Sequence, residues 1–184
     1  MENNLTRHFI RYGILYALIQ IVLTVGMYMA GIEFFASNMF LFGTFMLLLT
    51  IGYTIYSILQ FRKSVGGYMT LKEGFMVTFF TLAIAGLITT TFTIILYNVV
   101  DKEYPQQLAE KSIQKTSEMM ERFGATEEEI EKRMGDVGDT AEQFTVMGQI
   151  RGYLYGLVIY AIYAVILGAI FKRARPPFEE PKIG

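Results

Sequence analysis

Long apolar stretches alternate with short polar connections along this chain. Four stretches contain no Asp, Glu, Lys or Arg: 12–32, 34–61, 74–100 and 152–171. They are 21, 28, 27 and 20 residues long. Because a helix rises about 1.5 Å per residue, about 20 residues cross a hydrocarbon layer about 30 Å thick. Each stretch is therefore long enough to span a membrane as a helix.

The same stretches lack the pattern of membrane-spanning strands. Such strands alternate apolar and polar residues over about 10 positions, whereas segments such as 84–88 and 154–159 show no such alternation. Inside lipid, a helix satisfies its own backbone polar groups. We therefore predict an all-α polytopic membrane protein, a four-helix transmembrane bundle in one domain. The predicted spans are about 12–32, 37–60, 75–99 and 150–171.

The first stretch has a basic flank like that of a signal peptide, with Arg7 and Arg11 before it. Its apolar run is longer than the usual run of about 7–15 residues, and Tyr28 is too bulky for a cleavage site after Ala30. We therefore expect this segment to be a retained helix.

The segment 101–148 is the part of the chain that resembles a soluble protein. Pro105 suits the first turn of a helix, where its missing N–H costs nothing. Gly124 suits the position just after the end of that helix. The segment is therefore expected to form a helical insert between the third and fourth spans.

Further sequence patterns predict local structure in the rest of the insert and at the end of the chain. Thr126–Glu129 fits a capping box, which predicts a short second helix through about Met134. Asp139 is expected to cap a helix that runs through Phe144 and Met147 into the fourth span. The tail, 176–184, is expected to be flexible and cytoplasmic.

Basic residues predict how the spans are oriented. The cytoplasmic ends of membrane helices carry an excess of Lys and Arg. With both termini in the cytoplasm, that side carries nine basic and four acidic residues, a net charge of +5, and the other side a net charge of −6. We therefore predict cytoplasmic termini and an extracytoplasmic insert. The basic residues on the predicted cytoplasmic side are Arg7, Arg11, Arg62, Lys63, Lys72, Lys172, Arg173, Arg175 and Lys182.

The amino-acid composition limits the kinds of metal site and catalytic site that the chain can form. The chain has no Cys, which excludes thiolate metal sites and Cys nucleophiles, and its one His is His8, whereas a metal site usually needs several ligands. We interpret His8 as a solvated or headgroup-facing side chain. The four charge-free stretches contain no ionisable Asp, Glu, Lys, Arg or His, which argues against an ion-coupled transporter and an intramembrane acid–base enzyme. We predict no metal, no cofactor, no catalytic residue and, with a net charge of −1, no nucleic-acid partner.

Small residues recur at every fourth position in the third and fourth spans. Such ridges let helix backbones approach closely, either within one chain or against a partner. We favour contacts within the chain, and a second copy or another membrane protein is the alternative. The first ridge is Gly148, Gly152 and Gly156, resumed at Ala164 and Gly168, and the second is Thr81, Ala85, Thr89 and Thr93.

Polar residues within the spans allow two interpretations. They could line a polar path, or they could bond between helices and, for Thr, back to their own helix. We favour hydrogen bonding. Gln20 is the most informative position because an amide at mid-depth needs a partner. The polar residues are Gln20, Thr50, Tyr53, Thr54, Thr89, Thr90 and Thr91.

Two connections hold the candidate functional positions. In the loop after the second span, Gly66–Gly67 predicts a turn, and the basic residues can contact anionic headgroups. The glycine pair lacks the spacing of a phosphate-binding loop. Where the third span ends, polar side chains can bind a ligand or a metal, or they can cap the next helix, and we favour capping. The candidates are Arg62, Gly66, Gly67, Glu73, Asn98 and Asp101.

Two motifs point to a family. Arg62–Phe75 reads RK-x-x-GGY-x-x-x-x-EGF, and Tyr97–Tyr104 reads YN-x-x-D-x-EY. With four spans and a helical insert before the last, the chain resembles the bacteroidete inner-membrane family known as domain of unknown function 4199, over nearly its whole length. The resemblance implies a bacterial cytoplasmic membrane. It assigns no catalytic or binding residue.

Three hypotheses for function follow. The first is a non-enzymatic scaffold or accessory subunit of a cell-envelope assembly, which would bind a second copy or a membrane protein partner in the lipid bilayer. The second is a carrier or flippase for a lipid or a small apolar molecule. The third, which we favour least, is an enzyme that works at the membrane surface with Glu73 or Asp101.

Overall fold

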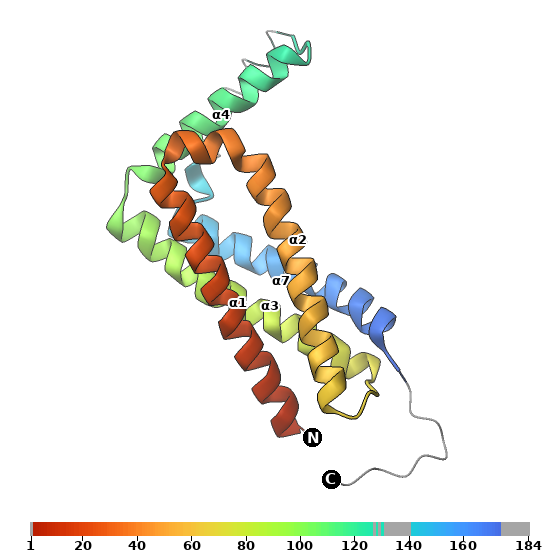
Figure 1. Cartoon of the computed structure of the whole chain (residues 1–184). Helices are drawn as coiled ribbons and strands as arrows, with labels where there is room; N and C mark the ends of the chain where they lie inside the picture. Colours follow the sequence, from red (N-terminus) through yellow and green to blue (C-terminus); the bar gives the residue numbers. More distant parts are fainter. Residues whose placement is uncertain (1, 127, 129, 131–140, 174–184) are drawn as a thin grey trace. The chain divides into compact units, whose positions relative to one another are not determined.

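The computed structural model describes residues 2–126, 128, 130 and 141–173 (Figure 1). Their helices are α1 Glu2–Ala30, α2 Ile32–Ser64, α3 Leu71–Ile95, the π-helical turn η1 Leu96–Val100, α4 Tyr104–Arg122 and α7 Val146–Phe171. Four stretches are long and apolar enough to cross a membrane: Asn4–Ala30, Ile32–Ser64, Leu71–Val100 and Val146–Phe171. The predicted all-α polytopic bundle with four spans is confirmed.

The helices α1, α2 and α7 are longer than the corresponding apolar stretches, and the first two helices are joined differently from the prediction. The predicted spans left a connection at 33–36, but α1 ends at Ala30 and α2 begins at Ile32. The chain turns at Gly31, whose φ of +93° favours glycine. The Gly31 N–H donates to the Tyr28 carbonyl (3.2 Å), and the Phe35 N–H donates to the Gly31 carbonyl (3.0 Å). One glycine therefore replaces the expected loop.

The chain divides into two compact units, and each of the four spans contributes to both. Unit 1 takes its described residues from Met1–Ile19, Leu47–Ile88 and Leu154–Gly184. Unit 2 takes them from Gln20–Met46 and Thr89–Tyr153. The insert helix α4 therefore belongs to unit 2.

Unit 1 has a core to which all four spans contribute. One cluster joins Leu5 of α1, Phe61 of α2, Val77 of α3 and Leu167 of α7. A second cluster surrounds Tyr16, which is fully buried. Many large apolar side chains on the outer faces of the same helices are exposed, as expected for surfaces that face lipid. A buried core and exposed apolar side chains on the outer faces are together typical of a membrane helix bundle.

Unit 2 is centred on aromatic residues. Tyr97 of η1 stacks on Tyr104 of α4, with ring centroids 5.6 Å apart, and Leu108 of α4 is buried beside them. Tyr28 of α1 packs against the same cluster, 4.8 Å from the Tyr104 ring. The insert helix is therefore joined to the spans through its first turns.

The two ends of α4 match the sequence prediction. Pro105 lies in the first turn, after the N-cap residue Glu103. Gly124 follows the C-cap residue Phe123 with a φ of +83°, the left-handed conformation that commonly ends helices. Both helix signals are confirmed.

The segment before α7 differs from the prediction. Phe144 was expected inside a helix, but it lies in a turn, and α7 begins at Val146. The Thr145 hydroxyl accepts the Gly148 N–H (3.1 Å) and so caps the helix. The predicted second insert helix from 126 to 134, the cap at Asp139 and the tail 176–184 fall largely or wholly outside the residues that the structure describes.

Candidate functional site

Glu73 caps a helix. It was a candidate in the loop after α2, and its carboxylate accepts the Thr70 N–H (2.7 Å) and the Thr70 hydroxyl (2.8 Å). The Glu73 N–H donates to the Thr70 hydroxyl (3.2 Å). This reciprocal arrangement is a capping box at the start of α3. The pattern T-x-x-E at 70–73 could have revealed it, but we did not recognise it in the sequence.

Gly66 and Gly67 form the predicted turn. Their φ angles are +83° and +89°, and the Gly67 N–H donates to the Arg62 carbonyl (2.8 Å). The bond satisfies a carbonyl at the end of α2. The two glycines thus end one helix so that the chain can start the next.

The same loop is fastened to the segment after α7. Met69 and Arg173 exchange two backbone hydrogen bonds, of 3.0 and 2.8 Å, in an antiparallel bridge. The Arg173 guanidinium lies 5.8 Å from the centre of the Tyr68 ring. Nothing in the sequence pattern indicated this contact, which joins positions 104 residues apart.

Asp101 has the capping role that we favoured. Its carboxylate accepts the Tyr104 N–H (3.0 Å) at the start of α4. The other oxygen accepts the Tyr28 hydroxyl (2.8 Å) from α1. Asp101 therefore fixes the start of the insert helix to the end of the first span.

Asn98 does not cap α4. Its amide donates to the Ile94 carbonyl (3.1 Å) and to the Phe144 carbonyl (3.2 Å). The Gln149 amide donates to the same Phe144 carbonyl (2.9 Å). These bonds connect the π-helical turn to the turn before α7, a role that a local sequence pattern could not show.

A shallow pocket of about 590 Å³ lies in unit 2, beside the π-helical turn. Its lining includes Asn98, Lys102 and Glu142. Glu142 is its one carboxylate and pairs with Arg151 at 2.9 Å. Among the described residues, no group of three or more His, Cys, Asp or Glu side chains could hold a metal ion. The pocket thus offers no pair of free acid and base.

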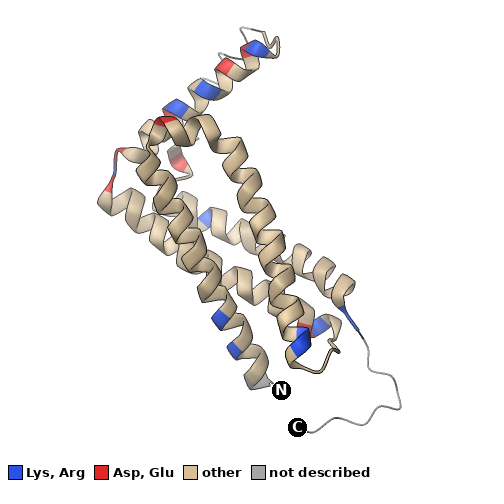
Figure 2. Ribbon diagram, in the orientation of Figure 1, with Lys and Arg blue, Asp and Glu red and all other residues tan. Residues whose placement is uncertain are grey.

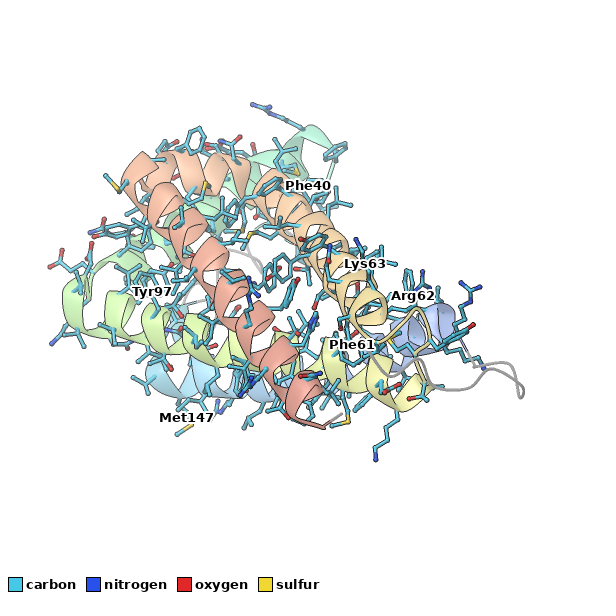
Figure 3. The ribbon with its side chains drawn as sticks, turned by 60° about the horizontal axis from the view of Figure 1, so that its bottom comes forward. Phe40, Phe61, Arg62, Lys63, Tyr97 and Met147 are labelled. Carbon is cyan, nitrogen blue, oxygen red and sulfur yellow. The ribbon has the colours of Figure 1, made fainter. Side chains whose placement is uncertain are left out.

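The six candidate positions are divided between the two units. Arg62, Gly66, Gly67 and Glu73 belong to unit 1, whereas Asn98 and Asp101 belong to unit 2. Arg62 is half-buried at the end of α2 (Figure 3). The side-chain hydrogen bonds of Glu73, Asn98 and Asp101 fix helix ends and turns.

Most polar side chains within the spans are hydrogen-bonded. Gln20, which needed a partner, accepts the Thr89 hydroxyl (2.9 Å) in unit 2. In unit 1, the Thr54 hydroxyl bonds back to the Thr50 carbonyl (2.7 Å) and meets the Tyr163 hydroxyl (2.8 Å). These bonds agree with the hydrogen-bonding interpretation. Thr78 and Thr81 of α3 differ, because their buried hydroxyls have no partner among the described atoms.

His8 is more enclosed than we expected. It is half-buried, its Nε2 lies 3.0 Å from the Ser57 carbonyl oxygen, and its ring stacks on Tyr12 with centroids 4.2 Å apart. The interpretation of His8 as a solvated or headgroup-facing side chain stays a prediction for the exposed part of the ring. A lone His gave no sequence signal of this contact, because Ser57 is 49 residues away.

The small residues of α7 have different surroundings. Ala164 is fully buried, and Gly168 lies directly against α3. Gly152 has open space where a Cβ would be, and the atoms nearest to a Cβ at Gly156 belong to Tyr160 of its own helix. Gly148 fits beneath the Glu142 carbonyl. The intrachain interpretation therefore applies to Ala164 and Gly168, whereas contact of Gly152 with a partner stays a prediction.

Comparison with known proteins gives one match. A family model described as "Protein of unknown function (DUF4199)" matches residues 11–173. No curated protein and no solved structure matches the chain. The matched range includes all of α2, α3 and α4 and all of α7.

Proposed function

The chain belongs to this DUF4199 family, and from that premise we propose that it is a non-enzymatic scaffold or accessory subunit of a cell-envelope assembly. The proposal includes a bacterial cytoplasmic membrane with both termini inside. The observation that carries it is the attachment of α4. One end of this helix is held firmly in unit 2, and the other end presents apolar side chains.

The first half of α4 is held by burial and by charge. Leu108 and Ala109 are buried in unit 2. Glu33, at the start of α2, pairs with Lys111 at 3.5 Å and with Lys115 at 3.2 Å. With the Asp101 cap, these contacts join α4 to both α1 and α2. These contacts therefore fix the position of α4 relative to the neighbouring ends of α1 and α2.

The second half of α4 continues the same face, and apolar side chains on it are exposed. Leu108 and Met119 are separated by 11 residues, close to three full helical turns, and the C-cap residue Phe123 follows four residues later. The three side chains therefore lie on one side of the helix. Met119 is 52% exposed and Phe123 is 85% exposed. In Figure 1, α4 extends beyond the turn between α1 and α2. Apolar anchors spaced four residues apart are typical of a helix that binds in the groove of a partner.

The carboxylates nearest to the candidate positions support a non-enzymatic role. Glu73 and Asp101 are engaged in helix caps, and Glu142 is paired with Arg151. A general acid or base needs to reach a substrate. Carboxylates that fix helix ends are better suited to stability than to catalysis.

The experiment is a pull-down of the full chain from native membranes in mild detergent, with proteins and lipids identified by mass spectrometry. We expect a stoichiometric membrane protein partner, or a second copy, with the wild-type chain. The double variant Met119→Ser/Phe123→Ser should lose that partner, because the exposed apolar anchors are gone.

The matched control is Gln107→Ser, an exposed position on the held half of α4. This variant should keep the partner. A chain that is monomeric and alone after gentle extraction contradicts the proposal. So does a partner that both variants retain equally.

A carrier or flippase is the second candidate, and Thr78 and Thr81 favour it. Their hydroxyls lie one helical turn apart in α3, inside unit 1, and have no partner among the described atoms. A polar headgroup could use such hydroxyls during passage between helices. Reconstituted vesicles with a fluorescent lipid test this candidate. Movement of the lipid between leaflets that Thr78→Val/Thr81→Val abolishes would support it, and no movement with the wild-type chain excludes it.

A further inference from the structure

We infer that unit 1 carries a cationic face that binds the phosphate headgroups of anionic phospholipids. The inference is independent of the scaffold proposal, because it concerns a different unit and a different partner. The cationic face consists of Arg7, Arg62, Lys63, Lys72, Lys172 and Arg173.

Packing brings the segments that carry these residues to one end of unit 1. Leu5, Phe61, Met69 and Leu167 share one buried cluster. The backbone bridge between Met69 and Arg173 then fastens the end of α7 to the α2–α3 loop. Each basic residue of the face lies within six positions of a member of this cluster. Figure 2 shows the basic segments at the ends of α1, α2 and α7 that these contacts join.

Among the residues that the structure describes, no ion pair involves a positive charge of the face. The ion pairs between described residues join Glu33, Glu118 and Glu142 to residues of unit 2. The carboxylate of Glu73 is at the face, where its Oε2 accepts both Thr70 hydrogen bonds, and no ion pair between described residues includes it. Lys63, Lys72 and Lys172 are exposed to solvent. Within the described part of the chain, the face therefore has positive charges that anions can bind.

The apolar surface beside the face identifies the source of those anions. Leu59, Leu71 and Ile170 are exposed on the helices whose ends carry the charges. A soluble phosphate would satisfy the cations and leave these side chains in water. A phospholipid leaflet supplies acyl chains to the apolar surface and phosphates to the adjacent cations. The juxtaposition points to a lipid headgroup as the occupant.

Arg173 occupies a fixed position in this face. Its N–H and carbonyl are bonded to Met69, and its guanidinium lies over the Tyr68 ring. A guanidinium held in this way can form paired hydrogen bonds to phosphate oxygens with little further ordering. It is the member of the face best prepared to hold one headgroup rather than a diffuse layer of anions.

The test uses the full chain in nanodiscs made from equal parts of phosphatidylglycerol and phosphatidylcholine. Native mass spectrometry after release counts the lipids that stay bound. We expect phosphatidylglycerol to be retained in clear excess. In Lys63→Gln/Lys172→Gln the excess should fall at least about fivefold, since each basic residue near the surface contributes measurably to the attraction.

The matched control is Lys102→Gln/Arg122→Gln, which removes the same charge from unit 2 at two exposed positions. It should leave the excess unchanged. Added salt should weaken retention in the wild-type chain, because it screens exposed charges. Equal retention of the two lipids by the wild-type chain overturns the inference, and so does an equal loss in both double variants. Circular dichroism confirms that each variant is folded.

Discussion

A Cβ atom added to Gly74 would lie 2.9 Å from the Cα atom of Gly168, so α3 and α7 meet there with their backbones almost in contact. A Cβ on Gly168 would in turn lie 3.0 Å from the Leu71 carbonyl oxygen and 3.0 Å from the Phe75 nitrogen. Most of these neighbours are backbone atoms, which cannot move aside as a flexible side chain could. Small residues at such crossings allow the close packing that stabilises helices in lipid.

We therefore predict that Gly168→Val and Gly74→Val each lower the free energy of unfolding by about 1–3 kcal/mol, the usual effect of overpacking. The measurement is unfolding in mixed micelles by a denaturing detergent, followed by circular dichroism. Gly52→Val is the control, because a Cβ at Gly52 meets nothing within 4 Å. An equal loss at Gly52 would mean that the valine itself, and not the crossing, is responsible.

The Asp101 carboxylate gives a second prediction. It accepts hydrogen bonds from both the Tyr104 N–H and the Tyr28 hydroxyl. Asp101→Ala should cost about 1 kcal/mol through the lost cap and should loosen the start of α4. Limited trypsin digestion should then cut the insert faster. Asp101→Asn retains an acceptor and should be cut more slowly than Asp101→Ala; the same rate for both would contradict a capping role.

The pairing of Lys115 predicts a dependence on pH. Hydrogen bonds to Glu33 and Glu118 raise the pKa of Lys115 above its ordinary value of 10.5. The folded state thus holds the proton more tightly than the unfolded state. The stabilisation is complete below pH 10.5 and is lost as pH rises through the higher folded pKa.

Thermal unfolding on either side of pH 10.5 tests this sign. The midpoint should fall less steeply with rising pH in Lys115→Gln than in the wild-type chain. Because the pair is exposed, added salt should reduce the difference. Identical pH profiles for the two proteins would show that the pair contributes nothing to stability.

For Thr78 and Thr81 we predict the opposite effect of substitution on the free energy of unfolding. A buried hydroxyl without a partner is costly, and an apolar group of the same shape removes that cost. Thr78→Val/Thr81→Val should therefore leave the free energy of unfolding unchanged or raise it by about 1 kcal/mol. Thr54→Val is the comparison, since its hydroxyl contacts Tyr163, and this change should destabilise. Destabilisation by the double variant would reveal a bound partner for these hydroxyls.

The charge distribution predicts the membrane topology of the chain. Because the chain has no Cys, a single introduced thiol can be labelled without background from native cysteines. Gln107→Cys in α4 and Ser64→Cys at the end of α2 each introduce a single thiol. A maleimide that cannot cross the membrane should label Gln107→Cys in cells with a permeabilised outer envelope and an intact cytoplasmic membrane. Ser64→Cys should be labelled only after that membrane is lysed. The reverse pattern would place the insert in the cytoplasm.

The sequence by itself determined the four spans, the insert helix and the turn at Gly66–Gly67. These features depend on local rules: a helix that crosses lipid must be apolar over about 20 residues, Pro105 and Gly124 suit opposite ends of one helix, and a left-handed turn favours glycine. The capping box of Thr70 and Glu73 is equally local, and its pattern is visible in the sequence.

Only the tertiary structure decided which distant residues meet. Met69 bridges Arg173, Glu33 pairs with Lys115, and Gly74 lies against Gly168. Each contact depends on how helices pack, and hydropathy does not encode it, because every face of a lipid-exposed helix is apolar. Asp101 and Glu73 looked alike as isolated carboxylates, and their partners in space gave each a role at the start of a helix.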